Sequence, residues 1–572
     1  MSFKILNILL SFSFINAPIR GVNHKQIPAE GEIRERRVIH LTGSSLSIED
    51  VVAIARSNAK VEIESSIWEK VARSHDLLLA AAKEDKPIYG LNRGVGLNKD
   101  KKIFKGDALS DEALAVSVLF NRSNLHATSS AVGPEMPNKM VRAIMLVKLN
   151  SILQGTTGAQ PKVAELLAEF LKRDIHPIVP SRGSVGEADI MILSHIGLAL
   201  MGEGEVFFQG KRTAAKKALE LNHLAPLVPY AKDSLAIMSS NAYSAALGAL
   251  LLHDAEQLLN RSDAVFAVSL EGLNGNIAPL LEEVQNLRPY PGQMESAARI
   301  RKLLEGSSLW IPSRERELQD PLSFRSVSQV HGTARDFLNS AKQKLLLHLN
   351  SSDDNPVTVL DPKAKGDSEQ ESAFYLSNGK GAVIPTSNFD SINWAIDFEA
   401  LGIALSHLSH LSSQRMVRLA TDRFTHLSRF LSPNATPLAF SAIQKTFMAL
   451  DAENRSLSMP VSADFFPIAG DIEDHATNAP AVLARTCQMI DNLYYILGME
   501  LMHASQAVDL RTQAHPHFQL GSGTRELYEA YRKEVPFLDK DRPLSKDIEI
   551  SHDFLVLRDR RTATPTCIFK DP

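Results

Sequence analysis

Long stretches of helical periodicity constrain the fold of this chain more than any other feature of its sequence. In the segment 391–421, apolar residues recur at steps of four and three, as is typical of one face of a helix: Trp394, Phe398, Leu401, Leu405 and Leu408. A helix this long must bury its apolar face against neighbours of similar length. We therefore predict an all-α protein built around a long central helical bundle.

Further helical patterns recur along nearly the whole chain, whereas strand patterns are few. Helices are expected near 64–83, 110–127, 135–171, 189–202, 238–260, 324–350, 391–421, 435–450 and 479–511. Residues 203–211 indicate a small hairpin. We expect an N-terminal extension (1–38), a smaller mixed N-terminal part (39–230), the central bundle (231–515) and a C-terminal tail (516–572).

The first seventeen residues have the proportions of a short signal segment. Lys4 precedes about eleven mostly apolar residues, which suits a signal peptide but is too short to span a bilayer. The alternative is an N-terminal extension without a role in export. Both interpretations stay open.

Charge and cysteine content exclude several classes of protein. The 62 Lys and Arg residues nearly balance the 66 Asp and Glu residues, so nothing in the net charge favours nucleic acid. The two cysteines, Cys487 and Cys567, form neither a disulfide framework nor a Cys-x-x-Cys metal motif. His407 and His410 have a spacing that can bind metal, but no third ligand is evident. We predict no nucleic-acid partner, no membrane partner and no metal site.

Polar and glycine-rich loops interrupt the helices and carry the candidate site residues. They lie at 89–96, 181–189, 319–325, 350–356 and 470–475. Tyr89 opens the first loop and could act as an acid or base, and Arg325 ends the third and could bind a carboxylate with paired N–H groups. Each loop taken alone fits equally well a plain turn, a helix cap or a structural ion pair.

Taken together and in this order, these segments resemble the aromatic amino-acid lyase family, which includes the histidine and phenylalanine ammonia-lyases. The similarity runs from about Leu41 to Glu549. Its matching segments are 46–52, 89–96, Asn150 with 154–158, 176–177, 183–186, 319–321, 350–356, 388–389, 473–475 and 504–511.

The resemblance implies a fold, an assembly and a reaction. The fold would be fumarase/aspartase-like, and the protein would be a cytoplasmic homotetramer whose active sites combine several subunits. The family eliminates ammonia from histidine or an aromatic amino acid to give an unsaturated acid. Because the β-proton is weakly acidic and the amine leaves poorly, the family uses an electron sink, a methylidene-imidazolone made from an internal Ala-Ser-Gly.

The sequence departs from the family at the place where this electrophile is made. The family has Ala-Ser-Gly-Asp after Gly186, whereas this chain has Glu187, Ala188 and Asp189, one residue fewer. No Ser or Cys remains there to be dehydrated. Ser184 is a poor substitute, because the valine that follows it would hinder ring closure. We predict that no methylidene-imidazolone forms and that no other cofactor is bound.

Several site residues of the family are retained in this chain. The resemblance implies Tyr89 as candidate base and Arg325 as the partner of the substrate carboxylate. It implies Asn355 as support for that carboxylate or its turn, and Glu473 as partner of the amine or as an acid or base. His126 falls near a histidine of the family, although this stretch aligns loosely.

Other positions differ from the family pattern. Ser239 stands where the family has Asn, and Asn241, two residues on, is a candidate replacement. Leu322 replaces a tyrosine, Arg93 replaces a threonine and brings a cation toward the expected site, and Asp353 replaces another threonine.

Three functional hypotheses remain open. In the first, the chain is a lyase that acts on an amino-acid-like small molecule without the electrophile, with Glu187, Arg93 and Glu473 as acid, base or charge-stabilising groups. A betaine would suit this reaction, because its trimethylammonium is a better leaving group. Ergothionase-like relatives, which also look to lack the Ala-Ser-Gly triad, use such a substrate. Acid-assisted elimination is the other option. In the second, it is a catalytically silent homologue that binds a ligand or serves as an oligomeric scaffold. In the third, it is a true histidine or phenylalanine ammonia-lyase with an unusual electrophile.

Overall fold

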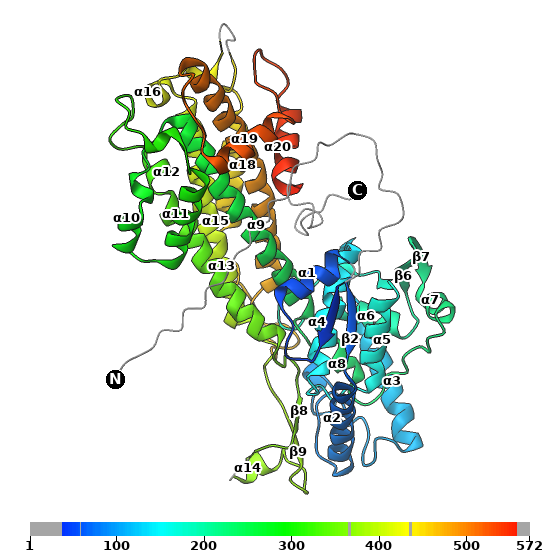
Figure 1. Cartoon of the computed structure of the whole chain (residues 1–572). Helices are drawn as coiled ribbons and strands as arrows, with labels where there is room; N and C mark the ends of the chain where they lie inside the picture. The colour runs from blue at the N-terminus through cyan, green and yellow to red at the C-terminus, as the bar shows by residue number, and fades with distance from the viewer. Residues whose placement is uncertain (1–36, 58, 364–367, 434–437, 558–572) are drawn as a thin grey trace. The chain divides into compact units, whose positions relative to one another are not determined.

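The four longest helices of the structure pack along one another and form its core (Figure 1). They are α9 (Ala242–Leu273), α13 (Val327–Leu349), α15 (Ile392–Leu419) and α18 (Ala479–Ala514). The computed structural model describes residues 37–57, 59–363, 368–433 and 438–557. The predicted all-α bundle is confirmed.

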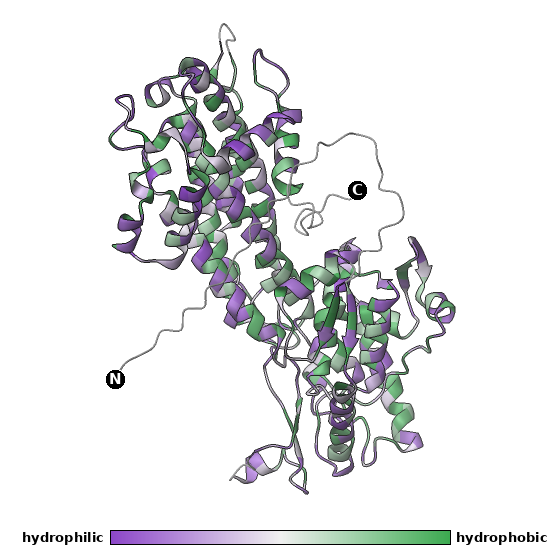
Figure 2. Ribbon diagram, viewed as in Figure 1, coloured by the Kyte–Doolittle hydropathy of each residue, from purple (hydrophilic) through white to green (hydrophobic). Residues whose placement is uncertain are grey.

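Helix α9 is buried around most of its circumference, because α18, α13 and α4 (Asn138–Leu153) all pack against it. The stretch Asp233–Leu273 has the length and composition of a membrane-spanning helix, yet its most apolar window is entirely buried inside the protein. Figure 2 shows apolar residues along these central helices, with polar residues more frequent on the outer elements. The apolar character of α9 therefore reflects its central place in the bundle.

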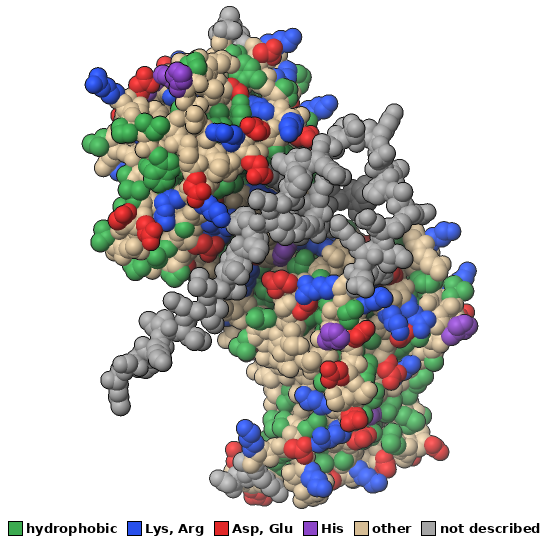
Figure 3. All heavy atoms as spheres, in the orientation of Figure 1, with side chains coloured by type: hydrophobic (Ala, Val, Ile, Leu, Met, Phe, Trp, Pro, Cys, Tyr) green, Lys and Arg blue, Asp and Glu red, His purple; other side chains and the backbone are tan. Residues whose placement is uncertain are grey.

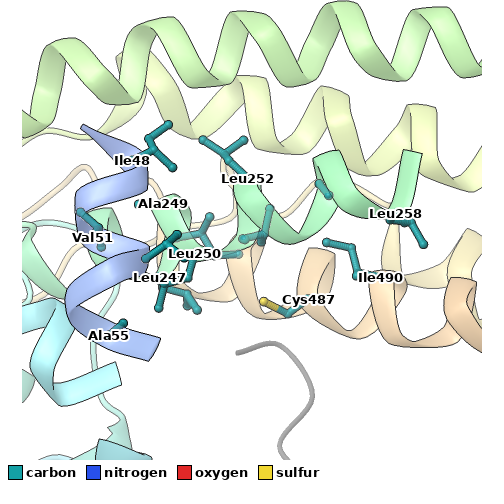
Figure 4. Close-up of a cluster of buried hydrophobic side chains, with 14 of the residues drawn as sticks. Ile48, Val51, Ala55, Leu247, Ala249, Leu250, Leu252, Leu258, Cys487 and Ile490 are labelled. Carbon is teal, nitrogen blue, oxygen red and sulfur yellow. The ribbon is translucent and has the colours of Figure 1, made fainter. Parts of the chain in front are cut away.

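The N-terminal part contacts the bundle through α1 (Ile48–Arg56). Ser47 begins this helix with a capping box, in which its hydroxyl accepts the Asp50 N–H and its own N–H donates to the Asp50 carboxylate. Figure 4 shows Ile48, Val51 and Ala55 of α1 in one cluster of buried hydrophobic side chains with Leu247 and Leu252 of α9. This contact ties the N-terminal part to the bundle.

The N-terminal part is mixed, as expected. Its strands are β1 (Val38–Leu41), β2 (Lys60–Ile63), β3 (Val132–Glu135), β4 (His176–Pro177), β5 (Pro180–Arg182), β6 (Glu205–Phe208) and β7 (Lys211–Ala214). Its other helices are α2 (Ser65–Lys83), α3 (Asp111–Thr128), α5 (Pro161–Lys172), α6 (Ile190–Leu200), α7 (Ala215–Leu221) and α8 (Asp233–Met238). Strands β1 and β2 pair in parallel, β3 pairs antiparallel with β5, and β4 extends the antiparallel β6–β7 hairpin, which confirms the hairpin predicted at 203–211.

The remaining elements cover the bundle or extend from it. They are α10 (Glu282–Asn286), α11 (Pro291–Leu303), α12 (Leu322–Arg325), β8 (Val357–Leu360), α14 (Glu369–Ser372), β9 (Gly381–Ile384), α16 (Asp422–Thr425), α17 (Gln444–Leu457), α19 (Ser522–Arg532) and α20 (Ser545–Leu557). Strands β8 and β9 form an antiparallel hairpin. Residues expected to form a tail contain α19 and α20, which pack against α9 and α18 respectively.

Three helix predictions were wrong in their limits. The helix expected over 238–260 is α9, which begins at Ala242 and continues to Leu273. The helix expected over 135–171 is two helices, α4 and α5, because Gly155 and Gly158 have positive φ angles of 66° and 67° and Pro161 begins α5. The helix expected from 435 begins only at Gln444. The candidate signal segment, residues 1–17, lies outside the described residues.

The outer surface carries charges of both signs, which are interspersed over the face shown in Figure 3. The predicted histidine pair lies on α15, where His410 Nδ1 is 3.2 Å from Asp451 Oδ2. No group of His, Cys, Asp and Glu side chains that could hold a metal ion occurs among the residues that the structure describes.

Candidate active site

The loop 183–189, which stands where the family makes its electrophile, connects β5 to α6 and meets the starts of three of the long helices. The Gly186 carbonyl accepts hydrogen bonds from Asn241 Nδ2 (3.1 Å) and Ser391 Oγ (3.2 Å), and the Val185 carbonyl accepts the Asn478 N–H (2.8 Å). Asn241, Ser391 and Asn478 are the N-caps of α9, α15 and α18. Three positive helix ends therefore meet at this loop.

Only glycine fits at position 186. Its φ angle is +82°, and a Cβ atom there would lie 2.7 Å from the backbone nitrogen of Ala479 and 2.7 Å from Thr477 Oγ1. Ala188 also has a positive φ, +53°, which is unfavourable for a residue with a side chain. The loop thus approaches the start of α18 closely and is held in its conformation by its contacts.

Asp189 anchors the end of the loop. It is fully buried and occupies the N-cap position of α6, but its carboxylate accepts no hydrogen bond from an N–H of that helix. Instead, the carboxylate accepts hydrogen bonds from Ser184 Oγ (2.6 Å) and from both the N–H and the Oγ of Ser244 (2.8 Å each). Burial raises its pKa to about 6, against the effect of these three hydrogen bonds. Asp189 therefore bridges the loop and α9.

Glu187 has the most perturbed environment of the predicted catalytic residues. One of its carboxylate oxygens is buried and has no hydrogen-bond partner among the described residues, and its backbone pairs with that of Asp390. Burial, with the nearby charge of Glu473, raises the pKa of Glu187 to about 7; Asp390 acts in the same direction, and His475 opposes it. Perturbed carboxyl groups of this kind are typical of functional sites.

Tyr89 shares this electrostatic environment. Burial raises the pKa of its phenol, and the charge of Glu473 raises this pKa further. The hydrogen bond that the Gly96 N–H donates to the phenol oxygen (2.8 Å) acts in the opposite direction. The structure therefore places Tyr89 and Glu187 in the field of Glu473. All three predicted catalytic residues are brought together within one chain.

Asn355 and Asn241 lie on polar turns whose role is visible in their contacts. The Asn355 side-chain oxygen accepts the Thr386 N–H (2.9 Å), so it supports the turn that follows α13. Asn241 is fully buried and holds the loop through Gly186, while its own side-chain oxygen has no partner among the described residues.

Of the other predicted substrate-binding residues, Arg93 is joined to this cluster through its backbone, whereas Arg325 and His126 make no contact with it within the described residues of one chain. Arg325 ends α12, where its Nη1 donates to Gln319 Oε1 (2.7 Å) and its Nε is buried without a partner in the described residues. His126 lies on α3, half-exposed, with its Nε2 2.5 Å from Glu203 Oε2. The backbone of Arg93 pairs with Tyr89 and Lys102.

The loop does not fit the methylidene-imidazolone of the family. The two residues between Gly186 and Asp189 supply neither the serine that would be dehydrated nor the glycine that would close the ring. Ser184 is already engaged, because its hydroxyl donates to Asp189 and accepts the Gly186 N–H (3.1 Å). We therefore derive no catalytic step through that group.

The sequence alone did not identify three residues that shape the loop directly or through its neighbours: Ser391, Asn478 and Asp353. Ser391 and Asn478 each precede a long apolar helical pattern, the usual place of an N-cap, so that signal could have found them. Asp353 was noted only as a difference from the family.

Comparisons with known proteins agree with the resemblance found in the sequence. A model of the aromatic amino acid lyase family matches residues 46–533. Histidine ammonia-lyases of Geobacillus sp. and Myxococcus xanthus are 34% and 33% identical to the chain, over 92% and 89% of its length and 99% and 95% of theirs.

Solved structures show the same similarity. Ergothionase from Treponema denticola, an ergothioneine-degrading enzyme crystallised with desmethyl-ergothioneine sulfonic acid, has a TM-score of 0.83 and is 41% identical, covering 91% of this chain and 98% of that one. Tyrosine aminomutase from Streptomyces globisporus has a TM-score of 0.80 and 28% identity, covering 90% of this chain and 96% of that one.

Proposed function

The chain belongs to the aromatic amino acid lyase family, and we propose that it eliminates trimethylamine from a betaine of a histidine-like amino acid without an internal electrophile. The observation that carries this proposal is the loop 183–189, in which a half-buried glutamate with a raised pKa, Glu187, replaces the residues of the electrophile. The 41% identity to an ergothioneine-degrading enzyme supports the same substrate class.

The leaving group explains why the electrophile is dispensable. An amine in a free amino acid leaves poorly, so the family needs an electron sink. A trimethylammonium group already carries a full positive charge and departs as neutral trimethylamine. The base takes the β-proton, the C–H electron pair forms the double bond, and the C–N electron pair leaves with the amine.

The charges of the site suit a cationic substrate. Glu187, Glu473 and Asp390 present carboxyl groups around the loop, and their repulsion adds to burial in raising the pKa of Glu187. A quaternary ammonium has no N–H to donate, so it is held by such charges rather than by hydrogen bonds. Its arrival would favour the ionised forms of both Glu187 and Tyr89, because a nearby cation lowers the pKa of an acid.

These effects define the proposed roles of the residues. Tyr89 is the base that removes the β-proton, once the bound cation has lowered its pKa. Glu187 and Glu473 offset the charge of the ammonium until the amine departs. Arg325, which lies apart from this cluster within one chain, would bind the substrate carboxylate from a neighbouring copy in a homotetramer.

A substrate panel tests the proposal. Ergothioneine and the trimethylbetaine of histidine are expected to release trimethylamine together with an ultraviolet-absorbing unsaturated acid. Histidine, phenylalanine and tyrosine are expected to release no ammonia. Ammonia from histidine, with no trimethylamine from either betaine, would instead favour a true ammonia-lyase; no reaction and no thermal shift with any compound would favour a silent homologue.

The pH dependence of the same reaction provides an internal control. The raised pKa of Glu187 means that its carboxylate forms only above about pH 7, so kcat/KM for ergothioneine should rise as the pH increases through that value. Glu187→Gln should remove this rise and lower kcat/KM at pH 8. A pH profile that is identical in both proteins would show that Glu187 does not face the substrate cation.

A further inference from the structure

A buried carboxylate, Asp353, lies behind the loop on the turn that follows α13. The residue is 4% exposed. Its Oδ2 accepts the hydroxyl of Ser240 (2.6 Å) and the N–H of Asn241 (2.9 Å), and its Oδ1 accepts the hydroxyl of Ser151 (2.8 Å). Both carboxylate oxygens are therefore occupied, one of them by two donors from the turn 240–241.

The two residues that Asp353 holds are the same two that hold the loop. The Ser240 carbonyl accepts the Asp189 N–H (2.7 Å), and Asn241 Nδ2 donates to the Gly186 carbonyl (3.1 Å). These bonds fix the backbone immediately before and after the pair 187–188. A continuous chain of hydrogen bonds thus runs from Asp353 to both sides of Glu187.

The backbone between these two anchors is one that would relax without them. Ala188 has a φ of +53°, a conformation that costs free energy for an alanine and persists only where the surroundings impose it. If the turn 240–241 were released, the loop would gain other conformations, and the carboxylate of Glu187 would lose its fixed place.

A carboxylate supplies acceptors for all three of these donors. A hydroxyl oxygen, such as that of the threonine expected here from the family, cannot accept three hydrogen bonds in this geometry. Burial disfavours the charge of Asp353, yet the charges of Lys148 and His348 and the bonds from Ser240 and Ser151 hold its pKa below the ordinary value.

We infer that Asp353 is a positioning residue, which fixes the place of the Glu187 carboxylate through Ser240 and Asn241. The inference deepens the proposed function and rests on it, since the place of Glu187 matters for turnover only if that carboxylate faces the substrate. Ser151, which bonds the opposite oxygen of Asp353 from α4, offers a matched control.

Three variants test this inference: Asp353→Ala, Asp353→Asn and Ser151→Ala. Two measurements are made on each full-length protein: the pH profile of kcat/KM for ergothioneine, and amide hydrogen exchange in peptides that cover residues 183–195. Asp353→Ala is expected to lower kcat/KM at pH 8 about tenfold to a hundredfold, as displacement of a site by about 1 Å does. It should also move the acid limb to lower pH and speed exchange in the loop, because a released Glu187 is more solvated.

The control and the rescue separate positioning from general loss of stability. Ser151→Ala should keep the pH profile and the loop exchange of the parent protein. Asp353→Asn should largely restore the pH profile and the loop exchange of the parent protein, because one amide oxygen can still accept the two hydrogen bonds from the turn. If Asp353→Ala does not fold, Ser240→Ala, which removes one of those bonds, takes its place with the same expectations.

Two results would overturn the inference: an acid limb and loop exchange that stay unchanged in Asp353→Ala, or equal effects of Asp353→Ala and Ser151→Ala. Failure of the proposed function looks different. In that case the parent protein itself releases no trimethylamine, while the exchange measurement still decides whether Asp353 holds the loop.

Discussion

Replacing Tyr89 by Phe is expected to lower kcat for betaine elimination about 10²–10⁴-fold, the usual effect of removing a general base. The phenol is half-buried, lies in the field of Glu473 and accepts a hydrogen bond from the Gly96 N–H, which stabilises its ionised form. Phenylalanine keeps the ring and its packing but has no oxygen to take the β-proton. KM for ergothioneine should change much less than kcat, because the cation is held by the carboxylates.

Tyr528→Phe is the matched control for this change. Tyr528 lies on α19, where its hydroxyl donates to the Asp509 carboxylate outside the loop cluster. It should leave kcat unaltered, with trimethylamine release as the readout for both variants. A Tyr89→Phe protein that turns over at the parent rate would remove Tyr89 from the role of base.

The second large effect concerns stability rather than catalysis. Arg415 and Glu500 form an ion pair inside the bundle, with both side chains fully buried and N–O distances of 2.6 and 2.7 Å. Removing one member of a buried pair leaves the other charge without compensation and costs about 3–5 kcal/mol. Arg415→Met should therefore lower the free energy of unfolding by about that amount, measured by chemical denaturation.

Two companion variants test whether this loss of stability comes from the uncompensated charge. Arg418→Met changes an arginine of the same helix whose guanidinium donates to the neutral Gln414 side chain (2.8 Å) and lies over the Phe424 ring, so its cost should stay below about 1 kcal/mol. In the double variant Arg415→Met with Glu500→Leu, the uncompensated charge is gone and most of the stability should return. An Arg415→Met protein as stable as the parent would show that Glu500 is not buried as a charge.

Much of the fold was predictable, because apolar periodicity directly reports the buried face of a long helix. The expected segments 391–421 and 479–511 correspond closely to α15 and α18. Short helices such as α12 carry too few residues for a period to emerge. The parallel pairing of β1 with β2 joins segments separated by α1, so no local pattern specifies it.

The candidate site was predictable in its residues but not in its connections. The missing residue beside Glu187 is visible in the sequence alone, and the structure places Glu187 and Tyr89 in the field of Glu473. The contacts of Asp353 depend on three segments that are distant in the chain, α4, the turn 240–241 and the turn after α13. Such a carboxylate looks like part of a solvated turn until the tertiary structure buries it.

We propose that the protein turns over its substrate without a methylidene-imidazolone, and the mass of one peptide tests this proposal most directly. Cleavage after Arg182 and Lys211 releases residues 183–211, which contain the whole loop, Ser184 included. In protein that has been shown to turn over ergothioneine, this peptide should have the mass of its unmodified sequence. A mass lower by two water molecules would reveal dehydration and ring closure, and would contradict the proposal.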